Sequence, residues 1–432
     1  MIQSHRTAVV VGLALMLAFA ARPAAATDAP NALQRCVAAK AEQLDFSGVV
    51  AVTERGRPIA FLARGKLAGE GSAAITARTR FNLGSASKMF TAVAVAQLID
   101  AGTVRLDDAI GTFVKGLTPE ASAVTVRQLL THSSGLGDFF EPQNMAAMMK
   151  ARTASDILPL IAGDKPAFAP GSRFAYSNSG FALLGILIER VSGLSYGDYL
   201  ARHVFAPAGM IDTGPDPMPL ATLAVGMTAH QSGMAPPGPP SGPGLVLIGP
   251  DGRAMTPGAG GDAPGAGNPP MLRGPDGPAL APDRAAPAGT PALHPAPGAV
   301  EGYGTPAGGL FSTAADMQRF AQALLGDRLT RAATTAALTA PQILAAPATS
   351  SRPERNYGLG FGVGTEEGRK WFGHNGGTLG ANTEFAVFPD EQLTLTVLSN
   401  RDPPMASTLF AYLRKLALNP SLQASCETDG SP

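Results

Sequence analysis

The sequence predicts a mixed α/β (α+β) fold, in which an antiparallel sheet built from both ends of the chain is flanked by helices and carries an inserted helical lobe. Two observations predict it: strand-like runs recur near both ends of the chain, and segments with helical spacing dominate the middle. At 432 residues the chain is long enough for two domains, or for one large domain with a lobe.

The first residues have the features of a secretory signal peptide, assigned to residues 1–26. His5 and Arg6 precede an apolar run over residues 8–21, and the alanines at 24–26 offer a small-residue cleavage site. The run is shorter than the ~20 residues that span a bilayer, although an uncleaved anchor is the alternative. The mature protein is therefore expected to be periplasmic or secreted after cleavage near Ala26, with no stable membrane span.

The mature chain is expected to begin with a helix and a β-hairpin. Residues 31–43 have helical character, and residues 46–54 and 58–65 form two strand-like runs. The short stretch between the runs, with Gly56 at its centre, is typical of a hairpin turn. This hairpin would supply the N-terminal strands of the sheet.

Helices are expected to follow the hairpin. Residues 85–101 contain good helix formers, are apolar on most faces and end before Gly102, so this helix should be buried. Further segments with helical spacing are residues 126–131, 155–162, 180–191, 196–204 and 314–325. Residues 155–162 contain Pro159, which disfavours a continuous helix there.

The last third of the chain returns to strands. Strand-like runs cover residues 358–365, 383–388 and 393–400, and a closing helix covers residues 405–418. Since strands lie at both ends with helices between them, the sheet domain is assigned to residues 27–84 and 330–432. The helical lobe is assigned to residues 85–329.

A segment inside the lobe, residues 231–300, has a different composition. Gly, Pro and Ala dominate it, and apart from a hairpin-like run at residues 245–252 it has few large apolar side chains. Such a segment cannot bury enough apolar surface to offset the entropy lost on ordering, which favours a disordered insertion. The alternative is a mobile flap over a substrate cleft.

Ser85 and Lys88 form an S-x-x-K tetrad at the start of the first long helix. A spacing of three places the hydroxyl and the amine on one helical face. A serine hydroxyl is a weak nucleophile unless a neighbouring base takes its proton, and the lysine can be that base. Backbone N–H groups at a helix start favour developing negative charge. The tetrad indicates an acyl-enzyme hydrolase; the alternative is an N-cap serine followed by a surface lysine.

A second motif, Y-x-N, is formed by Tyr176 and Asn178. A phenol that shares its proton with a lysine can act as a general base and then as a general acid. The amide can hydrogen-bond both a lysine and a substrate carbonyl. The alternative is an ordinary turn rich in Ser and Asn.

A third motif, His374-Asn375-Gly376-Gly377, follows an aromatic pair and precedes strand-like segments. Glycines let a strand edge approach a substrate closely. The backbone N–H of Gly377 is expected to join that of Ser85 in an oxyanion hole. For His374 the alternative is a hydrogen-bonded histidine at a strand end.

Taken in order, the three motifs resemble those of the serine penicillin-recognising enzymes, in particular the class C β-lactamase, D-alanyl-D-alanine carboxypeptidase and esterase group. That family carries S-x-x-K, then Y-x-N, then K-T-G or H-x-G. Residues 124–136 and 308–317 are similar to its flanking segments. The resemblance runs from about residue 46 to about residue 404, interrupted by one insertion.

The resemblance implies a β-lactamase/transpeptidase-like fold that needs neither a metal nor a cofactor. The implied roles are Ser85 as nucleophile, Lys88 and Tyr176 as general-base pair, Asn178 as substrate- and lysine-binding amide, and His374, Asn375 and Gly376 as substrate-binding third motif. His132, within the first flanking segment, has a sequence context that indicates a structural turn rather than a catalytic role.

One departure from the family pattern bears on the substrate. The third motif here is His-Asn-Gly rather than Lys-Thr-Gly. Lysine offers a permanent cation to a substrate carboxylate, whereas histidine is mostly neutral near pH 7. The sequence therefore predicts a secreted serine hydrolase acting on esters or amides, an esterase or a peptidase on D-amino-acid substrates. The alternatives are a β-lactamase, or a catalytically silent protein of the same fold that binds muropeptides or β-lactams.

The net charge limits the classes of binding partner, and the number of cysteines limits the possible disulfides. The net charge is zero, which argues against nucleic acid as a partner and leaves a small ester, amide or peptide substrate; the oligomeric state stays open. Cys36 and Cys426 are the only cysteines, so an oxidising compartment allows one intramolecular pairing. In the proteins that this one resembles, the first and last helices pack side by side, which implies a Cys36–Cys426 disulfide. The alternative is two separate thiols.

Overall fold

The computed structural model describes residues 31–217, 219–229, 247–248, 254–255, 293–296, 304–349 and 354–429. All of them belong to the unit that begins at Asn31. The expected signal peptide lies outside the described residues, and so does the expected insertion at residues 231–300 apart from three short pieces.

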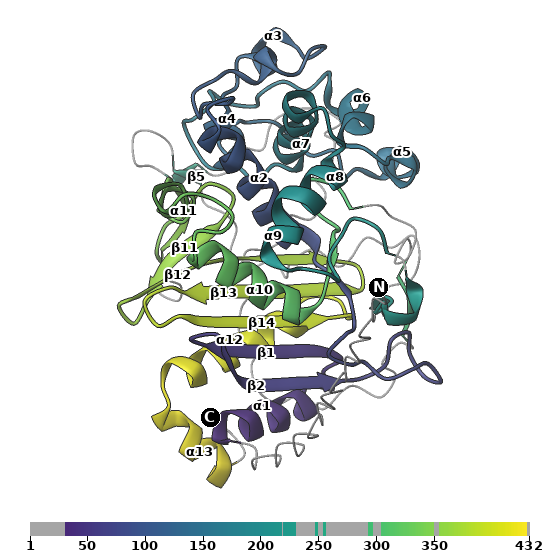
Figure 1. The fold of residues 1–432 in the computed structure, drawn as a ribbon, viewed down its shortest axis with the longest axis vertical. Coiled ribbons are helices and arrows are strands. Elements are labelled where there is room, and N and C mark those ends of the chain that lie inside the picture. Colours follow the sequence, from purple (N-terminus) through teal and green to yellow (C-terminus); the bar gives the residue numbers. More distant parts are fainter. Residues whose placement is uncertain are drawn as a thin grey trace, which may run out of the picture. The chain divides into compact units, whose positions relative to one another are not determined.

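Both ends of the chain contribute to one antiparallel sheet, as the sequence predicted. Within the described residues its eight strands have the order β2-β1-β14-β13-β12-β11-β10-β9 (Figure 1). The bounds are β1 Gly48–Glu54, β2 Arg57–Arg64, β9 Ile343–Ala346, β10 Arg355–Tyr357, β11 Gly362–Glu366, β12 Arg369–Thr378, β13 Ala381–Phe388 and β14 Leu393–Ser399. The join between the ends is the pair β1–β14, in which Val50 lies opposite Val397.

The hairpin between β1 and β2 forms where the sequence placed it. Glu54 lies directly opposite Arg57, so Arg55 and Gly56 are the two turn residues. Both have positive φ, 49° and 74°, as the tight turns that suit the twist of a hairpin require. Gly56 adopts this conformation without the steric cost that a side chain would add.

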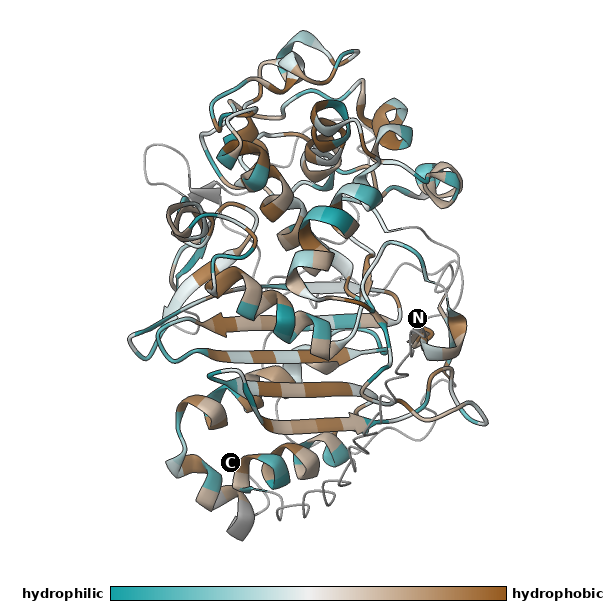
Figure 2. Ribbon diagram, viewed as in Figure 1, coloured by the Kyte–Doolittle hydropathy of each residue, from teal (hydrophilic) through white to brown (hydrophobic). Residues whose placement is uncertain are grey.

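Helices cover both faces of the sheet, and the alternation of side chains along each strand divides the core in two. Val50 and Val52 of β1 pack with helices α1 (Ala32–Gln43) and α12 (Met405–Leu418). Val49 and Ala51 point to the opposite face and pack in the cluster that contains α2 (Lys88–Asp100) and α10 (Ala314–Leu325). Figure 2 shows hydrophobic positions recurring along β1, β13 and β14, as expected for a sheet buried on both faces.

The remaining helices follow β3 (Phe81–Asn82) and are mostly short. Their bounds are α3 Pro119–Ser122, α4 Val126–Leu130, α5 Met145–Lys150, α6 Leu158–Ile161, α7 Asn178–Ser192, α8 Tyr196–Leu200, α9 Ala206–Ala208, α11 Ala332–Leu338 and α13 Ser421–Asp429. The helix expected over residues 196–204 is α8 continued by a π-helical turn, Ala201–Phe205. Among the described residues no helix combines the length and apolarity needed to cross a bilayer.

Two expectations about local structure were wrong, and one strand was missed. The helix expected over residues 155–162 is a 3₁₀ turn, Ala154–Ile157, followed by α6, whose first turn accommodates Pro159 because no N–H is needed there. The strand expected over residues 358–365 begins only at Gly362, since Gly360 with φ of 82° forms a turn before it. Strand β12 was not predicted as a strand, because glycines weaken its β propensity.

The first long helix also differs from the expectation at its start. Residues Gly84–Ser87 form a 3₁₀ turn, η1, and the α-helix α2 begins only at Lys88. The Ser87 hydroxyl donates to Gly84 O at 2.8 Å and accepts from Leu310 N at 3.1 Å, which holds the tight turn in place. As expected, the helix is buried over most of its length, from Lys88 to Ala96.

The structure joins Cys36 of α1 and Cys426 of α13 in a disulfide, with 5.9 Å between the two Cα atoms. Helix α13 thereby lies against α1 (Figure 1). Non-reducing peptide mapping should recover the two cysteines in one linked peptide. Replacing both by serine should lower the free energy of unfolding by roughly 2–5 kcal/mol, measured by urea denaturation, because the bond restricts the unfolded chain. Two alkylatable thiols in the untreated protein would contradict this pairing.

Candidate active site

Ser85 and Lys88 lie at the junction of η1 and α2, where the chain passes from 3₁₀ to α geometry. Side chains three residues apart eclipse one another in a 3₁₀ turn, so the serine lies directly in line with the lysine. The distance between Lys88 Nζ and Ser85 Oγ is 3.3 Å. Both side chains are buried, Ser85 being 6% and Lys88 0% exposed. Lys88 is therefore not a surface lysine, which was the alternative reading of the sequence.

The Lys88 amine is surrounded by hydrogen-bond acceptors. Besides Ser85 Oγ, it donates to Asn178 Oδ1 at 2.6 Å and to the backbone oxygen of Ala307. Burial lowers the pKa of Lys88 from its ordinary value to about 7, and the negative charge of Asp138 opposes this effect. Near neutral pH the amine is therefore present in both its charged and its neutral form.

The Ala307 carbonyl belongs to a segment that wraps the start of α2. Gly309 N donates to Gly84 O at 3.2 Å, and Leu83 N donates to Leu310 O at 2.8 Å. A Cβ atom at Gly308 would lie 3.3 Å from Gly84 O, which is a close approach. This backbone contact explains the glycine pair in the segment that the sequence marked as similar to the family.

Asn178 is the first residue of α7, whose N-cap Ser177 accepts from Gly180 N at 3.0 Å. Both polar atoms of the Asn178 amide form hydrogen bonds. Its Oδ1 accepts from Lys88, and its Nδ2 donates to Asp138 Oδ2 at 2.6 Å. The sequence identified Asn178 but not Asp138, which lies on the loop after α4; nothing about its spacing connects it to the three motifs.

Tyr176 lies beside the lysine, with Lys88 Nζ 4.7 Å from the centre of its ring. The side chain is partly exposed, but its hydroxyl oxygen is buried and has no hydrogen-bond partner of standard geometry among the described residues. Burial raises the pKa of Tyr176 well above its ordinary value, and the nearby Ser85 hydroxyl opposes the rise. Tyr176 is accordingly a neutral phenol near pH 7.

His132 packs against Tyr176. Its ring stacks on that of Tyr176 with 4.2 Å between centroids, and its Nδ1 accepts from Ser177 N at 3.0 Å. Its backbone has a positive φ of 53°, which is uncommon for a residue with a side chain. Burial holds the pKa of His132 well below its ordinary value. These contacts match the structural turn that the sequence indicated.

The third motif lies on β12, whose edge packs against η1. A Cβ atom at Gly376 would lie 1.9 Å from Leu83 O and 2.9 Å from Ser85 N, so only glycine fits there. A Cβ atom at Gly84 would lie 2.8 Å from Gly377 N. The amide nitrogens of Ser85 and Gly377 therefore flank the same residue, Gly84, which is where an oxyanion hole was expected.

His374 is buried on the same strand, and both of its ring nitrogens have partners. Nδ1 lies 2.5 Å from Asn375 O, an acceptor, so Nδ1 carries the proton. Nε2 then accepts from the Tyr357 hydroxyl at 2.9 Å. Burial lowers the pKa of His374 to about 3, so the ring is neutral near pH 7. Asn375, on the opposite face of the strand, is partly exposed.

Tyr357 was missed by sequence reasoning. It comes from β10, a strand of three residues too short to show an alternating pattern. Burial, and to a lesser degree Tyr176, raise the pKa of Tyr357. It is a neutral hydroxyl that donates to the third motif.

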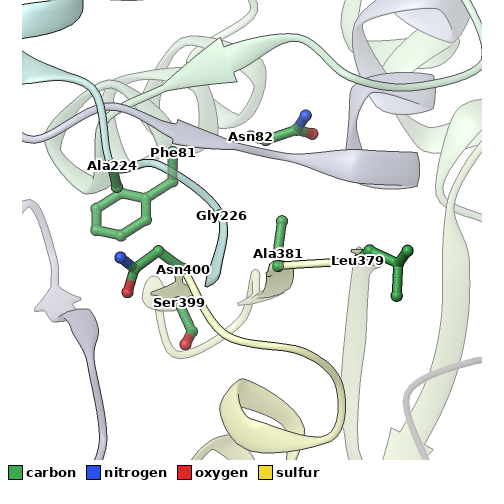
Figure 3. Close-up of a pocket in the computed structure, with 9 residues that line it drawn as sticks. Phe81, Asn82, Ala224, Gly226, Leu379, Ala381, Ser399 and Asn400 are labelled. Atoms are coloured by element: carbon green, nitrogen blue, oxygen red, sulfur yellow. The ribbon is translucent and has the colours of Figure 1, made fainter. Parts of the chain in front are cut away.

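A small hollow lies next to these groups and does not contain them. Figure 3 shows its lining residues, which are Phe81, Asn82, Ala224, Gly226, Leu379, Gly380, Ala381, Ser399 and Asn400. It adjoins the site through Asn82, whose Oδ1 accepts from Gly84 N at 2.8 Å. In the part of the chain that the structure describes, no group of three or more His, Cys, Asp or Glu side chains could hold a metal ion.

Comparison with known proteins gives consistent matches. The family model described as Beta-lactamase matches residues 33–418. A curated relative, penicillin-binding protein 4* of Bacillus subtilis, is 31% identical over 176 residues, which are 40% of this chain and 38% of that protein. The chain spans only 28–39% of the lengths of the first such relatives.

Solved structures show the same fold at lower identity. A penicillin-binding protein from Bacillus halodurans has a TM-score of 0.65 and 24% identity, covering 89% of this chain and 99% of that one. A D-amino acid amidase from Ochrobactrum anthropi, solved with D-phenylalanine, has a TM-score of 0.63 and 22% identity, covering 92% and 99%.

Proposed function

The chain belongs to the beta-lactamase family of serine hydrolases, and from that premise we propose that Ser85 forms an acyl-enzyme with ester or D-amino-acid-type amide substrates. The observation that carries the proposal is the set of partners around Lys88. A neutral amine has two N–H donors and one lone pair. Asn178 Oδ1 and Ala307 O accept these two donors, so in the neutral form the contact with Ser85, 3.3 Å long, reverses its direction: the Ser85 hydroxyl donates to the Lys88 lone pair. Lys88 is thus oriented to take the serine proton.

The negative charge that develops on the attacked carbonyl oxygen needs donors that are already in place. The amide nitrogens of Ser85 and Gly377, which flank Gly84, are well situated to supply two N–H groups. Because β12 is a strand of the central sheet, its backbone is held rigidly. The stabilisation would therefore need no rearrangement during the reaction.

Tyr176 supplies the second proton transfer. As a neutral phenol it donates its proton to the leaving group while the serine proton rests on Lys88. The resulting phenolate, beside the Lys88 ammonium, accepts a proton from the water that attacks the acyl-enzyme. Ser85 leaves the acyl group and recovers its proton from Lys88, so both residues return to their starting states.

The third motif favours substrates without a carboxylate at this position. His374 is neutral and its ring nitrogens are committed to Asn375 and Tyr357, so it offers no cation and no free donor. We therefore propose an esterase or an amidase on D-amino-acid substrates rather than an efficient β-lactamase. The fold shared with a D-amino acid amidase is consistent with this choice.

The substrate class can be tested by comparing kcat/KM for p-nitrophenyl butyrate, a D-amino acid amide and nitrocefin. We expect ester or amide hydrolysis to exceed nitrocefin hydrolysis at least tenfold, because the β-lactam carboxylate finds no cation at His374. A clear preference for nitrocefin would contradict the proposal. Stable labelling by penicillin without any turnover would indicate the silent binding protein instead.

We also propose that the protein functions in the periplasm or outside the cell. The Cys36–Cys426 disulfide supports this location, because such bonds persist in oxidising compartments. Fractionation of producing cells, followed by N-terminal sequencing of the processed chain, tests it.

A further inference from the structure

The loop between α4 and α5 places a carboxylate behind the Asn178 amide. Asp138 Oδ2 accepts from Asn178 Nδ2 at 2.6 Å, and its Oδ1 accepts from Phe140 N at 2.9 Å. The loop is also attached to the start of α7, because the Ser177 hydroxyl donates to Gly137 O at 2.8 Å. One Asp138 oxygen therefore accepts a hydrogen bond within its own loop, and the other accepts one from the active-site amide.

We propose that Asp138 is a positioning residue for the acylation step: it holds the Asn178 amide in the orientation that presents Oδ1, and not Nδ2, to the Lys88 amine. This inference rests on the proposed function, because it concerns the same lysine. It adds a residue that none of the three motifs contains.

The two ends of an amide side chain are nearly equal in size, so polarity decides which way it lies. A carboxylate only accepts hydrogen bonds, so Asp138 requires Nδ2 on its side. Oδ1 then faces Lys88 and takes one of its N–H groups. If the amide were reversed, Nδ2 would donate to the Lys88 lone pair, and that lone pair would no longer be available to Ser85.

Asp138 also acts through its charge. It is the negative group that opposes the lowering of the Lys88 pKa. The other groups facing Lys88 carry no charge near pH 7: His132 and His374 have lowered pKa values, and the Tyr176 and Phe181 rings are neutral. Removing the carboxylate should therefore move the Lys88 pKa further down, below about 7.

Asp138→Asn tests both effects, since it keeps the shape and removes the charge. We expect kcat/KM at its plateau to fall roughly ten- to a hundredfold, the usual effect of losing a hydrogen bond to a charged group. We also expect the acid limb of the pH profile to move to lower pH. Asp138→Glu, which retains the carboxylate, should keep the acid limb near its wild-type position.

Glu141→Gln is the matched control, because Glu141 lies on the same loop and accepts from Gln143 rather than from Asn178. It should change neither the plateau nor the acid limb. An acid limb of Asp138→Asn at the wild-type position would overturn the proposal. So would equal losses in Asp138→Asn and Asp138→Glu that follow a fall in melting temperature, since a merely structural role predicts that pattern.

The Lys88 pKa can also be read without turnover, from the ¹³C shift of its Cε in lysine-labelled protein. A titration near pH 7 that moves down in Asp138→Asn supports the inference even if no substrate is hydrolysed. Turnover by the wild type together with an unmoved Lys88 titration would sink the inference and leave the proposed function standing. A failure of the Asp138 inference can thus be distinguished from a failure of the proposed function.

Discussion

Ser85→Ala is expected to lower kcat/KM for p-nitrophenyl butyrate by roughly a millionfold, the loss typical when the nucleophile of an acyl-transfer enzyme is removed. The reason is structural: the Ser85 hydroxyl lies 3.3 Å from the Lys88 amine. The change removes one buried hydroxyl oxygen, so the thermal unfolding of the variant should stay close to that of the wild type.

Ser87→Ala provides the matched control for this loss. Ser87 belongs to the same turn, but its hydroxyl bonds to Gly84 O and Leu310 N rather than to Lys88. This variant should lose some stability and keep most of its activity per folded molecule. If Ser85→Ala retained turnover, or if Ser87→Ala lost as much activity as Ser85→Ala, the nucleophile would be misassigned.

Lys88→Met is expected to lower kcat/KM by about 10²–10⁴-fold, the usual contribution of a positioned general base. Methionine has a similar length and no basic nitrogen. In the wild type, kcat/KM should rise with pH through about 7. The sign follows from the lowered pKa of Lys88, because the amine is neutral and able to take a proton only above that value. In Lys88→Met this acid limb should disappear.

Tyr176→Phe should produce a loss of similar size, and the double variant with Lys88→Met should lose far less than the product of the two single losses. Lys88 and Tyr176 carry successive protons in one catalytic cycle, and residues that act as such a unit give non-additive effects. Lys115→Met is the control, since Lys115 is exposed, lies in a different part of the chain and donates to Gly111 O. Independent, multiplying losses at Lys88 and Tyr176 would contradict their joint role.

The sequence predicted the parts of the fold that depend on local patterns. The β1–β2 hairpin, α10 and α12 appear where spacing and turn residues placed them. Strand β12 could not be predicted in this way, because its glycines lack β propensity. They are needed for a contact with η1, and η1 is almost 300 residues away in the chain. Only the folded structure brings these two segments together.

In the candidate site, too, local spacing could be predicted and contacts between distant segments could not. The spacing of Ser85 and Lys88 indicated chemistry, because i and i+3 share a face in any helix. Asp138 and Tyr357 gave no signal, since Asp138 lies on a loop and Tyr357 on the three-residue strand β10, and neither segment carries a motif. The neutrality of His374 likewise depends on Tyr357 and on burial, neither of which can be derived from the residue type alone.

The central claim is that Ser85 Oγ forms the covalent intermediate, and trapping that intermediate tests it most directly. The wild-type protein is treated with an alkyl fluorophosphonate, and its intact mass and proteolytic peptides are measured by mass spectrometry. The structure predicts one adduct per chain, on the peptide that contains Ser85, and none after Ser85→Ala. An adduct on another side chain, or ester turnover with Ser85 unlabelled, would contradict it.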